Sequence, residues 1–186
     1  GVTGRSQPIS LPAQASMSQA IEALWYLPRD LISDGYDAAL AALGTQLPMT
    51  VHEYPTGSAC WTWIIPPKWT CREAFLQTLD GRRLFSYADN ILHVASYSQP
   101  FEGVVNREEL FAHLETHPQL PDAIPWAWRF YRDDWALCCS QRQKAALTEA
   151  RYRVVIRSEF TPGALKVGEA VLPGSSQETI VLCAHL

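Results

Sequence analysis

Apolar residues recur at helical spacing in the first part of the chain. Ser16 or Ser18 can cap a helix through residues 20–25, which ends before Pro28. A second helix is predicted over 34–47, because its apolar side chains return every three or four positions. The pattern changes after this helix, where apolar and polar residues alternate or form short apolar runs.

The middle of the chain predicts mostly β-strands separated by turns. Asp80-Gly81 favours a tight hairpin turn between two strands, because glycine accepts the positive φ that such a turn requires. Period-two alternation and short β-branched or aromatic runs indicate strands at 49–54, 60–65, 75–79, 82–87, 91–97, 124–131, 152–160 and 165–171. Two short capped helices are predicted among them, namely 107–114 after Asn106 and 141–147 after Ser140.

The sequence closes with an apolar run, 179–186, that carries His185. The run predicts a buried strand with His185 at its carboxyl end, where open α/β enzymes place their chemistry. Neutral imidazole binds zinc, but a catalytic zinc needs about three protein ligands and a water. The pattern therefore predicts the front part of a metal-dependent hydrolase, with His185 as its first ligand. A polar residue at a chain end is the alternative interpretation.

Composition excludes several classes of protein. The chain has 186 residues, a hydrophobic fraction of 47% and a net charge of −4. Acidic and basic residues are interspersed, so no basic stripe indicates nucleic-acid binding. No run approaches the roughly 20 apolar residues of a membrane span, and the first residues lack the apolar core of a signal peptide. The five cysteines lack Cys-x-x-Cys spacing, which is typical of free thiols, so we expect a cytoplasmic protein.

Tryptophan is abundant, and six of the seven lie between residues 61 and 135. Large amphipathic rings fill a thin β core and its rim, so we expect most of them to be packed. The alternative is an aromatic platform for a sugar or a peptide. Alternate residues of a strand share one face, so the pairs Trp61/Trp63 and Trp126/Trp128 should each be wholly packed or wholly exposed.

Adjacent cysteines, Cys138 and Cys139, raise the question of a nucleophilic thiol. Such a thiol needs a depressed pKa and a histidine partner. His93 and His113 are available, but no spacing singles out either of them. We therefore favour buried structural thiols.

The remaining polar pairs are weak signals. His113 and His117 have the spacing of a shared helix face, but they lie where the predicted helix ends and lack an accompanying glutamate. His52-Glu53 is unspecific, and Asp133-Asp134 is interpreted as a solvated turn. The sequence contains no Gly-rich phosphate loop, Gly-x-Ser-x-Gly elbow or His-Glu-x-x-His motif.

Several ordered blocks of the chain follow a family pattern. The blocks are Leu24–Tyr36, His52–Gly57, Trp63–Pro66 with Lys68–Thr70, Phe85–Asn90, Cys138–Ser140 and Glu178–Leu186. Together they resemble a bacterial family of aminopeptidase-like proteins, often labelled as of unknown function or as polysaccharide-biosynthesis proteins with an aminopeptidase-like domain. The resemblance covers nearly everything from Leu24 onward, and the chain looks like the N-terminal part of such a protein.

The resemblance implies an α+β architecture. A strand-rich inserted domain is flanked by helices and by one strand of an incomplete α/β zinc-exopeptidase-like domain. The implied segments are a flexible leader (1–16), the front helices and strand of the peptidase-like domain (17–56), the inserted strand-rich domain (57–174) and a returning strand (175–186).

The same resemblance implies a site and a reaction. His185 matches the first zinc-ligand histidine, and full-length members are expected to bind two zinc ions. Their further ligands follow in segments that this sequence does not contain. The implied reaction hydrolyses an amide next to a free amino group, in a peptide or aminoacyl small molecule, with metals lowering the pKa of a bridging water. No nucleic acid or membrane is expected as a partner, and a homo-oligomer is left open.

Two other interpretations stay open. A non-catalytic binding or assembly module would fold without metal and bind a specific partner. A cysteine-dependent enzyme would use Cys138 or Cys139. The truncated hydrolase makes a further prediction, because a sheet without its later strands leaves Ile180 to Leu182 and the apolar faces of the front helices uncovered.

Overall fold

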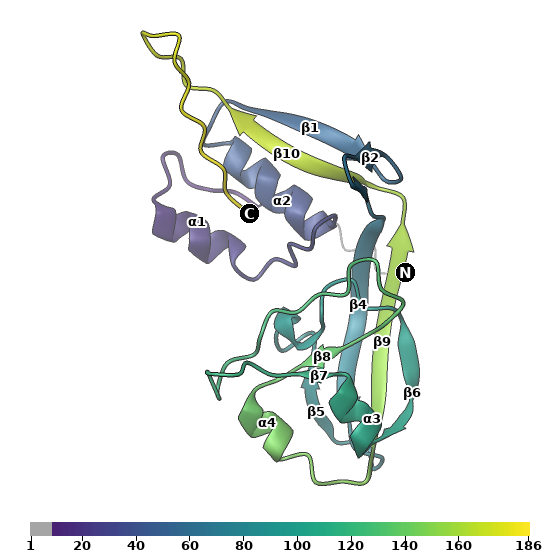
Figure 1. Cartoon of the computed structure of the whole chain (residues 1–186). Coiled ribbons are helices and arrows are strands. Elements are labelled where there is room, and N and C mark those ends of the chain that lie inside the picture. The colour runs from purple at the N-terminus through teal and green to yellow at the C-terminus, as the bar shows by residue number, and fades with distance from the viewer. Residues whose placement is uncertain (1–8) are drawn as a thin grey trace, which may run out of the picture. The chain divides into compact units, whose positions relative to one another are not determined.

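The computed structural model describes residues 9–186, which form two compact units (Figure 1). The sheet unit is the continuous segment 69–161, and the helical unit combines residues 9–68 with 162–186. Helices are combined with several small, mostly antiparallel sheets, so the predicted α+β class is confirmed. Within the described range, every helix is too short or too polar to cross a bilayer.

Two capped helices open the helical unit, as predicted. α1 (Met17–Leu24) begins after Ser16, whose hydroxyl accepts from Gln19 N while the Gln19 side chain accepts from Ser16 N. This reciprocal capping box satisfies two N–H groups that the first turn leaves unpaired. α2 (Asp34–Gly44) begins after Ser33, whose hydroxyl accepts a backbone N–H of the first turn at 3.1 Å.

A small apolar cluster joins these helices. It consists of Leu11, Leu24, Ala39 and Ala42. Leu11 belongs to the predicted flexible leader, of which residues 1–8 lie outside the described part of the chain. The described end of that segment contacts the helices, since Leu11 is buried and Ala15 N donates to Gln46 Oε1 at 2.9 Å.

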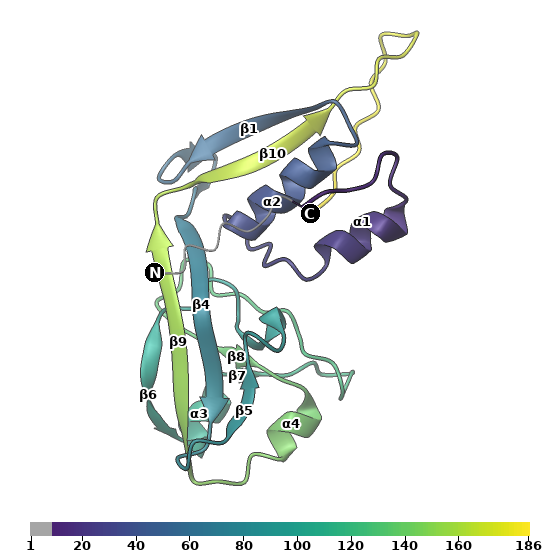
Figure 2. The same ribbon diagram turned by 180° about the vertical axis from the view of Figure 1, so that it is seen from behind.

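A two-stranded antiparallel ribbon completes the helical unit. β1 (Met49–Pro55) pairs with β10 (Ala164–Ala170) along its whole length, and both strands were predicted. α2 lies along one face of the ribbon (Figures 1 and 2). Tyr36 Oη donates to Lys166 O at 3.1 Å, and Lys166 Nζ lies 2.8 Å from Asp37 Oδ2.

A four-stranded sheet forms the sheet unit, in the order β5-β4-β9-β6. Its strands are β4 (Lys68–Gln77), β5 (Arg83–Ser86), β6 (Phe101–Asn106) and β9 (Arg151–Thr161). β4 and β9 run side by side at its centre (Figure 2). The turn between β4 and β5 is the predicted Asp80-Gly81 hairpin, with Gly81 at φ 91°. The largest fully buried side chains of this unit include Trp69, Tyr152, Leu76, Leu110, Leu137 and Ile156.

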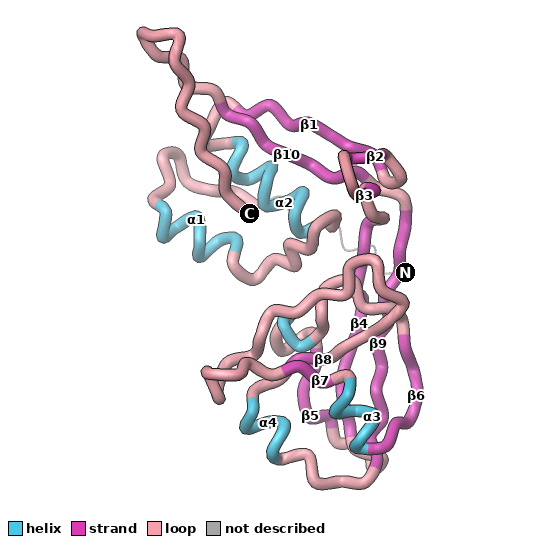
Figure 3. The backbone as a smooth tube through the Cα atoms, viewed as in Figure 1, coloured by secondary structure: helices cyan, strands magenta, loops and turns pink. Residues whose placement is uncertain are grey.

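Short elements cover one side of this sheet. α3 (Arg107–Ala112) and α4 (Gln141–Ala145) have the predicted caps, Asn106 and Ser140, and each ends two residues before its predicted bound. β7 (Leu114–Glu115) and β8 (Leu137–Cys138) form a two-residue parallel pair. The chain between them, residues 116–136, is a long loop (Figure 3).

Three predicted strands differ in the structure. The run 60–65 is a small hairpin of β2 (Ala59–Cys60) and β3 (Trp63–Ile64), because Trp61 adopts φ 53° and turns the chain. The run 91–97 begins with the 3-10 helix η1 (Ile91–His93), which Asn90 caps. The run 124–131 makes only an isolated bridge, Ser96 to Trp128. Pro125 contributes to this difference, since proline removes a backbone donor from a ladder.

The last residues do not form the predicted strand. Residues 171–186 contain no helix or strand among the described residues. A strand needs a neighbour to pair its backbone groups, and this segment has none in the described chain. Ile180 and Leu182 are 89% and 92% exposed, so the prediction that this run is buried is wrong for the described chain.

Candidate functional site

His185 lies beside the helices of the helical unit. Its neighbour Leu186 packs against the cluster around Leu11 and Leu24, so the chain end is placed near α1 and α2 (Figure 1). The His185 side chain is exposed. The imidazole therefore faces solvent, at the end of an apolar segment that is itself uncovered.

The described residues do not assemble a metal site. Across residues 9–186, no group of three His, Cys, Asp or Glu side chains is placed to hold an ion. His52, the other histidine of the helical unit, lies on β1 with Nε2 2.8 Å from Glu169 Oε2 in an exposed pair. A catalytic zinc needs about three protein ligands. The donor set of the described chain does not fit that requirement, because His185 stands alone.

Cys138 and Cys139 are buried structural thiols, as predicted. Burial raises the pKa of Cys138 to about 12 and that of Cys139 to about 11. His93 does not activate either thiol, because its Nδ1 lies 2.7 Å from the Cys138 carbonyl oxygen and must donate to it. Thiols with raised pKa values are poor nucleophiles near neutral pH, so the cysteine-enzyme interpretation loses its support.

His113 and His117 do not share a metal. His113 Nδ1 lies 2.8 Å from Trp135 O, and its ring stacks on that indole with centroids 4.1 Å apart. His117 Nδ1 accepts backbone N–H groups from Gln119 and Leu120 at 3.2 and 3.1 Å. One nitrogen of each ring is therefore used to hold the surrounding chain in place.

The buried side chain of Arg129 forms ion pairs that no pattern in the sequence indicates. The Arg129 side chain is 8% exposed, with Nη2 2.8 Å from Glu115 Oε1 and Nε 3.2 Å from Asp134 Oδ2. Nη1 donates to Trp128 O at 3.0 Å. Asp133 is exposed and the Asp134 side chain is 37% exposed, so Asp134 is only partly solvated in this turn. Charged partners at separations of 14 and 5 residues have no recognisable spacing, so the fold alone brings them together.

The tryptophans divide into packed and exposed groups. Trp69 and Trp135 are buried in the sheet unit, where Trp69 Nε1 donates to Ser98 O at 2.9 Å. Trp126 and Trp128 are both exposed, so the prediction that they are packed is wrong. The prediction that both rings of this pair are either packed or exposed is confirmed. Trp61 is fully exposed but Trp63 is only partly so, because Trp61 lies in a turn and the strand rule does not apply there.

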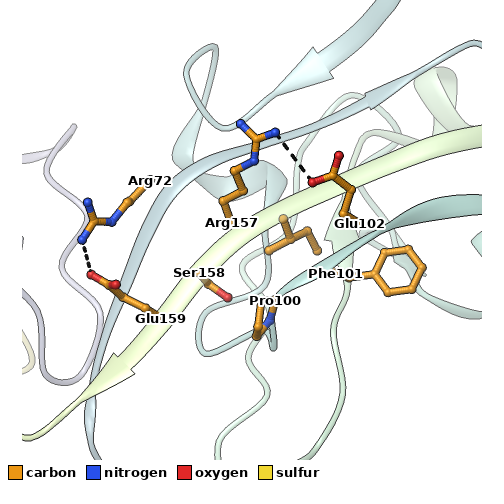
Figure 4. Close-up of a pocket in the computed structure, with 8 residues that line it drawn as sticks. Arg72, Pro100, Phe101, Glu102, Arg157, Ser158 and Glu159 are labelled. Atoms are coloured by element: carbon orange, nitrogen blue, oxygen red, sulfur yellow. Dashed lines mark hydrogen bonds and ion pairs between the residues drawn. The ribbon is translucent and has the colours of Figure 1, made fainter.

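A shallow groove of about 440 Å³ crosses the outer face of the sheet unit (Figure 4). Arg72 Nη2 lies 2.5 Å from Glu159 Oε1, and Arg157 Nη2 lies 3.6 Å from Glu102 Oε2. Ser158 Oγ donates to Ser98 O at 2.8 Å and is therefore not poised as a nucleophile. The groove is a charge-compensated sheet surface, and its geometry indicates no catalytic role.

Comparison with known proteins gives the class of the chain. Residues 68–159 match the family described as "Domain of unknown function (DUF2172)", and this range almost coincides with the sheet unit. The chain is 28% identical over 165 residues to a Clostridium acetobutylicum protein with the provisional name "polysaccharide biosynthesis protein with aminopeptidase-like domain". That alignment covers 89% of this chain and 38% of the relative.

A solved structure gives a second match of the same kind. A crystal structure from Clostridium acetobutylicum, provisionally assigned as a peptidase, matches with a TM-score of 0.74 and 28% identity. The match covers 80% of this chain and 35% of that chain. The chain is thus similar to a protein named for its aminopeptidase-like domain and to one assigned as a peptidase, and the resemblance found in its sequence is confirmed. It spans less than two fifths of the length of either match.

Proposed function

We propose that this chain supplies the first part of an aminopeptidase-like hydrolase that cleaves an amide next to a free amino group. The names of the two Clostridium matches support the peptidase class. The substrate would be a peptide or an aminoacyl small molecule, and the enzyme would act in the cytoplasm. In this proposal the sheet unit is an accessory domain, and the helical unit contributes to the catalytic domain.

One observation carries the proposal. Ile180, Val181 and Leu182 are exposed side by side, three residues before an exposed histidine. An exposed apolar run is costly in water, and it would be covered if a strand of a longer protein paired with it. His185 would then follow the carboxyl end of a sheet strand, the place where α/β enzymes bind ligands.

We also propose His185 as one ligand of a zinc site with two ions in that longer protein. The described residues supply no group of three such ligands, so a complete site would need ligands from outside residues 9–186. Neutral imidazole is a common zinc ligand. The proposal thus assigns a role to one residue of this chain and leaves the remainder of the site to the longer protein.

A longer polypeptide that continues beyond Leu186 tests the proposal. We expect it to bind zinc, measured by elemental analysis, and to release chromophore from aminoacyl p-nitroanilides until a chelator is added. His185→Ala should lose at least about a hundredfold in activity together with bound zinc. His52→Ala is the matched control, because it removes an exposed histidine of the same unit. Full zinc content and activity in His185→Ala would contradict the assignment.

A non-catalytic binding or assembly module is the second candidate. It is favoured by the sheet unit, which has a buried core of its own and matches a domain family over almost its whole length. This alternative predicts that the longer polypeptide folds identically with and without zinc and hydrolyses none of the test substrates. Thermal unfolding of the longer polypeptide with and without chelator separates the two candidates.

A further inference from the structure

The loop of residues 116–136 is unusual in its length and its composition. It joins β7 to β8 without a helix or strand of its own (Figure 3). Loops longer than about 15 residues are uncommon in compact domains and are usually either functional or disordered. The distinction between these two cases depends on how the loop is held.

Hydrogen bonds hold this loop along its length. Ser96 N donates to Ala127 O and Arg129 N donates to Ser96 O, both at 2.8 Å. Ala95 N donates to Ala136 O at 3.0 Å, and Gln141 Nε2 donates to His117 O at 2.6 Å. The buried Arg129 side chain adds its ion pairs to Glu115 and Asp134. The loop is therefore a fixed structure, not a disordered one.

The fixed backbone presents two indole rings to solvent. Ala127 packs inward against Ala95, Ala136 and Cys138, and Arg129 is buried. The alternating residues Trp126 and Trp128 are 61% and 43% exposed. Phe130 stacks on Trp128 with centroids 5.3 Å apart, and the Arg132 guanidinium lies 5.6 Å from the centre of the same ring. Trp128 is thus held in one orientation, beside the more exposed Trp126.

The exposed area favours a small ligand over a protein. A tryptophan side chain has roughly 250 Å² of surface, so the exposed parts of the two rings amount to roughly one ring. A stable protein interface buries about 800 Å² on each partner. The same loop exposes one further ring, Tyr131 at 64%, before the charged residues Arg132 and Asp133. A ligand that fits has one flat apolar face and a polar rim.

We propose that Trp126 and Trp128 form a carbohydrate-binding surface. In a pyranose with equatorial hydroxyls, the axial C–H bonds form an apolar face and the hydroxyls form a polar rim. The apolar face can stack on an indole ring, and the guanidinium of Arg132 offers several donors to hydroxyl oxygens. Because the backbone of the loop and the Trp128 ring are already held in place, binding immobilises little of that part of the protein. This proposal does not depend on the proposed hydrolase activity.

Titration of the 186-residue chain with cellotetraose and chitotetraose tests the surface. Their β-1,4-linked rings present the flat faces that the proposal requires. We expect a saturable change in tryptophan fluorescence and shifts of the two indole N–H resonances in NMR spectra. Trp126→Ala should weaken binding at least about tenfold, while Trp126→Phe should retain part of the affinity.

Trp61→Ala is the matched control. Trp61 is fully exposed, but it stands alone in the β2–β3 turn of the other unit. Unchanged affinity in Trp61→Ala, with loss in Trp126→Ala and a native circular dichroism spectrum in both, would support the proposal. No response at tens of millimolar of either sugar would overturn it, as would equal loss in both variants. Self-association that depends on Trp126 would also overturn it, in favour of a protein interface.

Discussion

The two units differ in how completely they cover their apolar side chains. The sheet unit buries large residues from both the sheet and the elements that cover it, including Trp69, Leu110, Leu137 and Tyr152. The helical unit buries fewer apolar side chains, and it exposes Met17, Ile21 and Trp25, which are spaced four residues apart along α1 and its C-cap. Both units follow the same rules of capping and strand pairing, so local structure does not explain the difference.

The difference shows what local pattern can and cannot supply. A cap determines where a helix begins, but a helix of eight residues such as α1 is marginal in water unless its apolar face packs against other residues. Exposed contiguous apolar surface marks a place where another segment or chain binds. The sheet unit therefore has the properties of a self-contained domain, while the helical unit leaves more of its apolar surface uncovered.

Gly35→Ala should damage the helical unit most. A Cβ at Gly35 would lie 2.2 Å from the carbonyl oxygen of Pro28, which is backbone and cannot move aside cheaply. We expect the free energy of unfolding of this unit to fall by about 3 kcal/mol or more. Hydrogen exchange read peptide by peptide should show loss of protection in α2 and β10, with protection of β4 and β9 retained.

Gly44→Ala is the control for this substitution. Gly44 ends the same helix, and the nearest outside atom would be 4.0 Å from its new Cβ. Alanine is the better helix former, so this change should stabilise the unit by about 0.5 kcal/mol. Loss of protection in both units after Gly35→Ala would contradict the view that the sheet unit is self-contained.

Arg129→Met should have the next largest effect, this time within the sheet unit. The change keeps the apolar part of the side chain and removes the charge that Glu115 and Asp134 share. Loss of hydrogen bonds to charged groups, with carboxylates left facing a partly buried site, should cost about 2–3 kcal/mol. Urea unfolding measures the loss, and hydrogen exchange should place it first in residues 116–136.

Arg142→Met is the matched surface change for Arg129→Met. Arg142 pairs with Asp122 in the same part of the chain, but both side chains are largely exposed. Solvent screens such a pair, so we expect a change within about 0.5 kcal/mol. Equal effects of the two substitutions would mean that Arg129 contributes no more than a surface charge, and the fixed loop would lose its explanation.

Much of the fold could be predicted because local signals and tertiary structure agree. Ser16, Asn106 and Ser140 cap helices in the structure as their sequence positions indicate. The Asp80-Gly81 turn and the long strands of the sheet are also local signals. Each of these features depends on backbone preferences over a few residues, so a single sequence contains enough information.

The ion pairs of Arg129 and the shape of the loop 116–136 could not be predicted in the same way. Arg129 meets Glu115 only because residues 116–136 fold back on β7, and no spacing in the sequence encodes that contact. The run 124–131 has strand-like alternation, but it forms only an isolated β-bridge at Trp128 and no strand. Period-two alternation reports which side chains face inward, and here it correctly separates Ala127 from Trp126 without requiring a strand.

The smallest predicted effect is a pH dependence of stability that belongs to the sheet unit alone. His93 is buried in the sheet unit, stacked on Phe85 with centroids 4.5 Å apart. Burial lowers the pKa of His93, although the Cys138 carbonyl and Asp89 oppose this shift. The unfolded chain therefore binds the proton more readily than the folded chain. The stabilising contribution is complete above about pH 6.5 and is lost as the pH falls below that value.

Unfolding of the sheet unit between pH 7.5 and 5.5 measures this effect. We expect the free energy of unfolding to decrease toward acid with a slope of at most about 1.4 kcal/mol per pH unit, the value for one proton. His93→Asn keeps an N–H donor for the Cys138 carbonyl and removes the titration, so its stability should be lower at pH 7.5 and flatter across the range. An equally steep profile in His93→Asn would show that another group binds the proton. A profile confined to helical-unit peptides in hydrogen exchange would instead assign acid sensitivity to the unit with the uncovered apolar surface, and the contrast between the units would reverse.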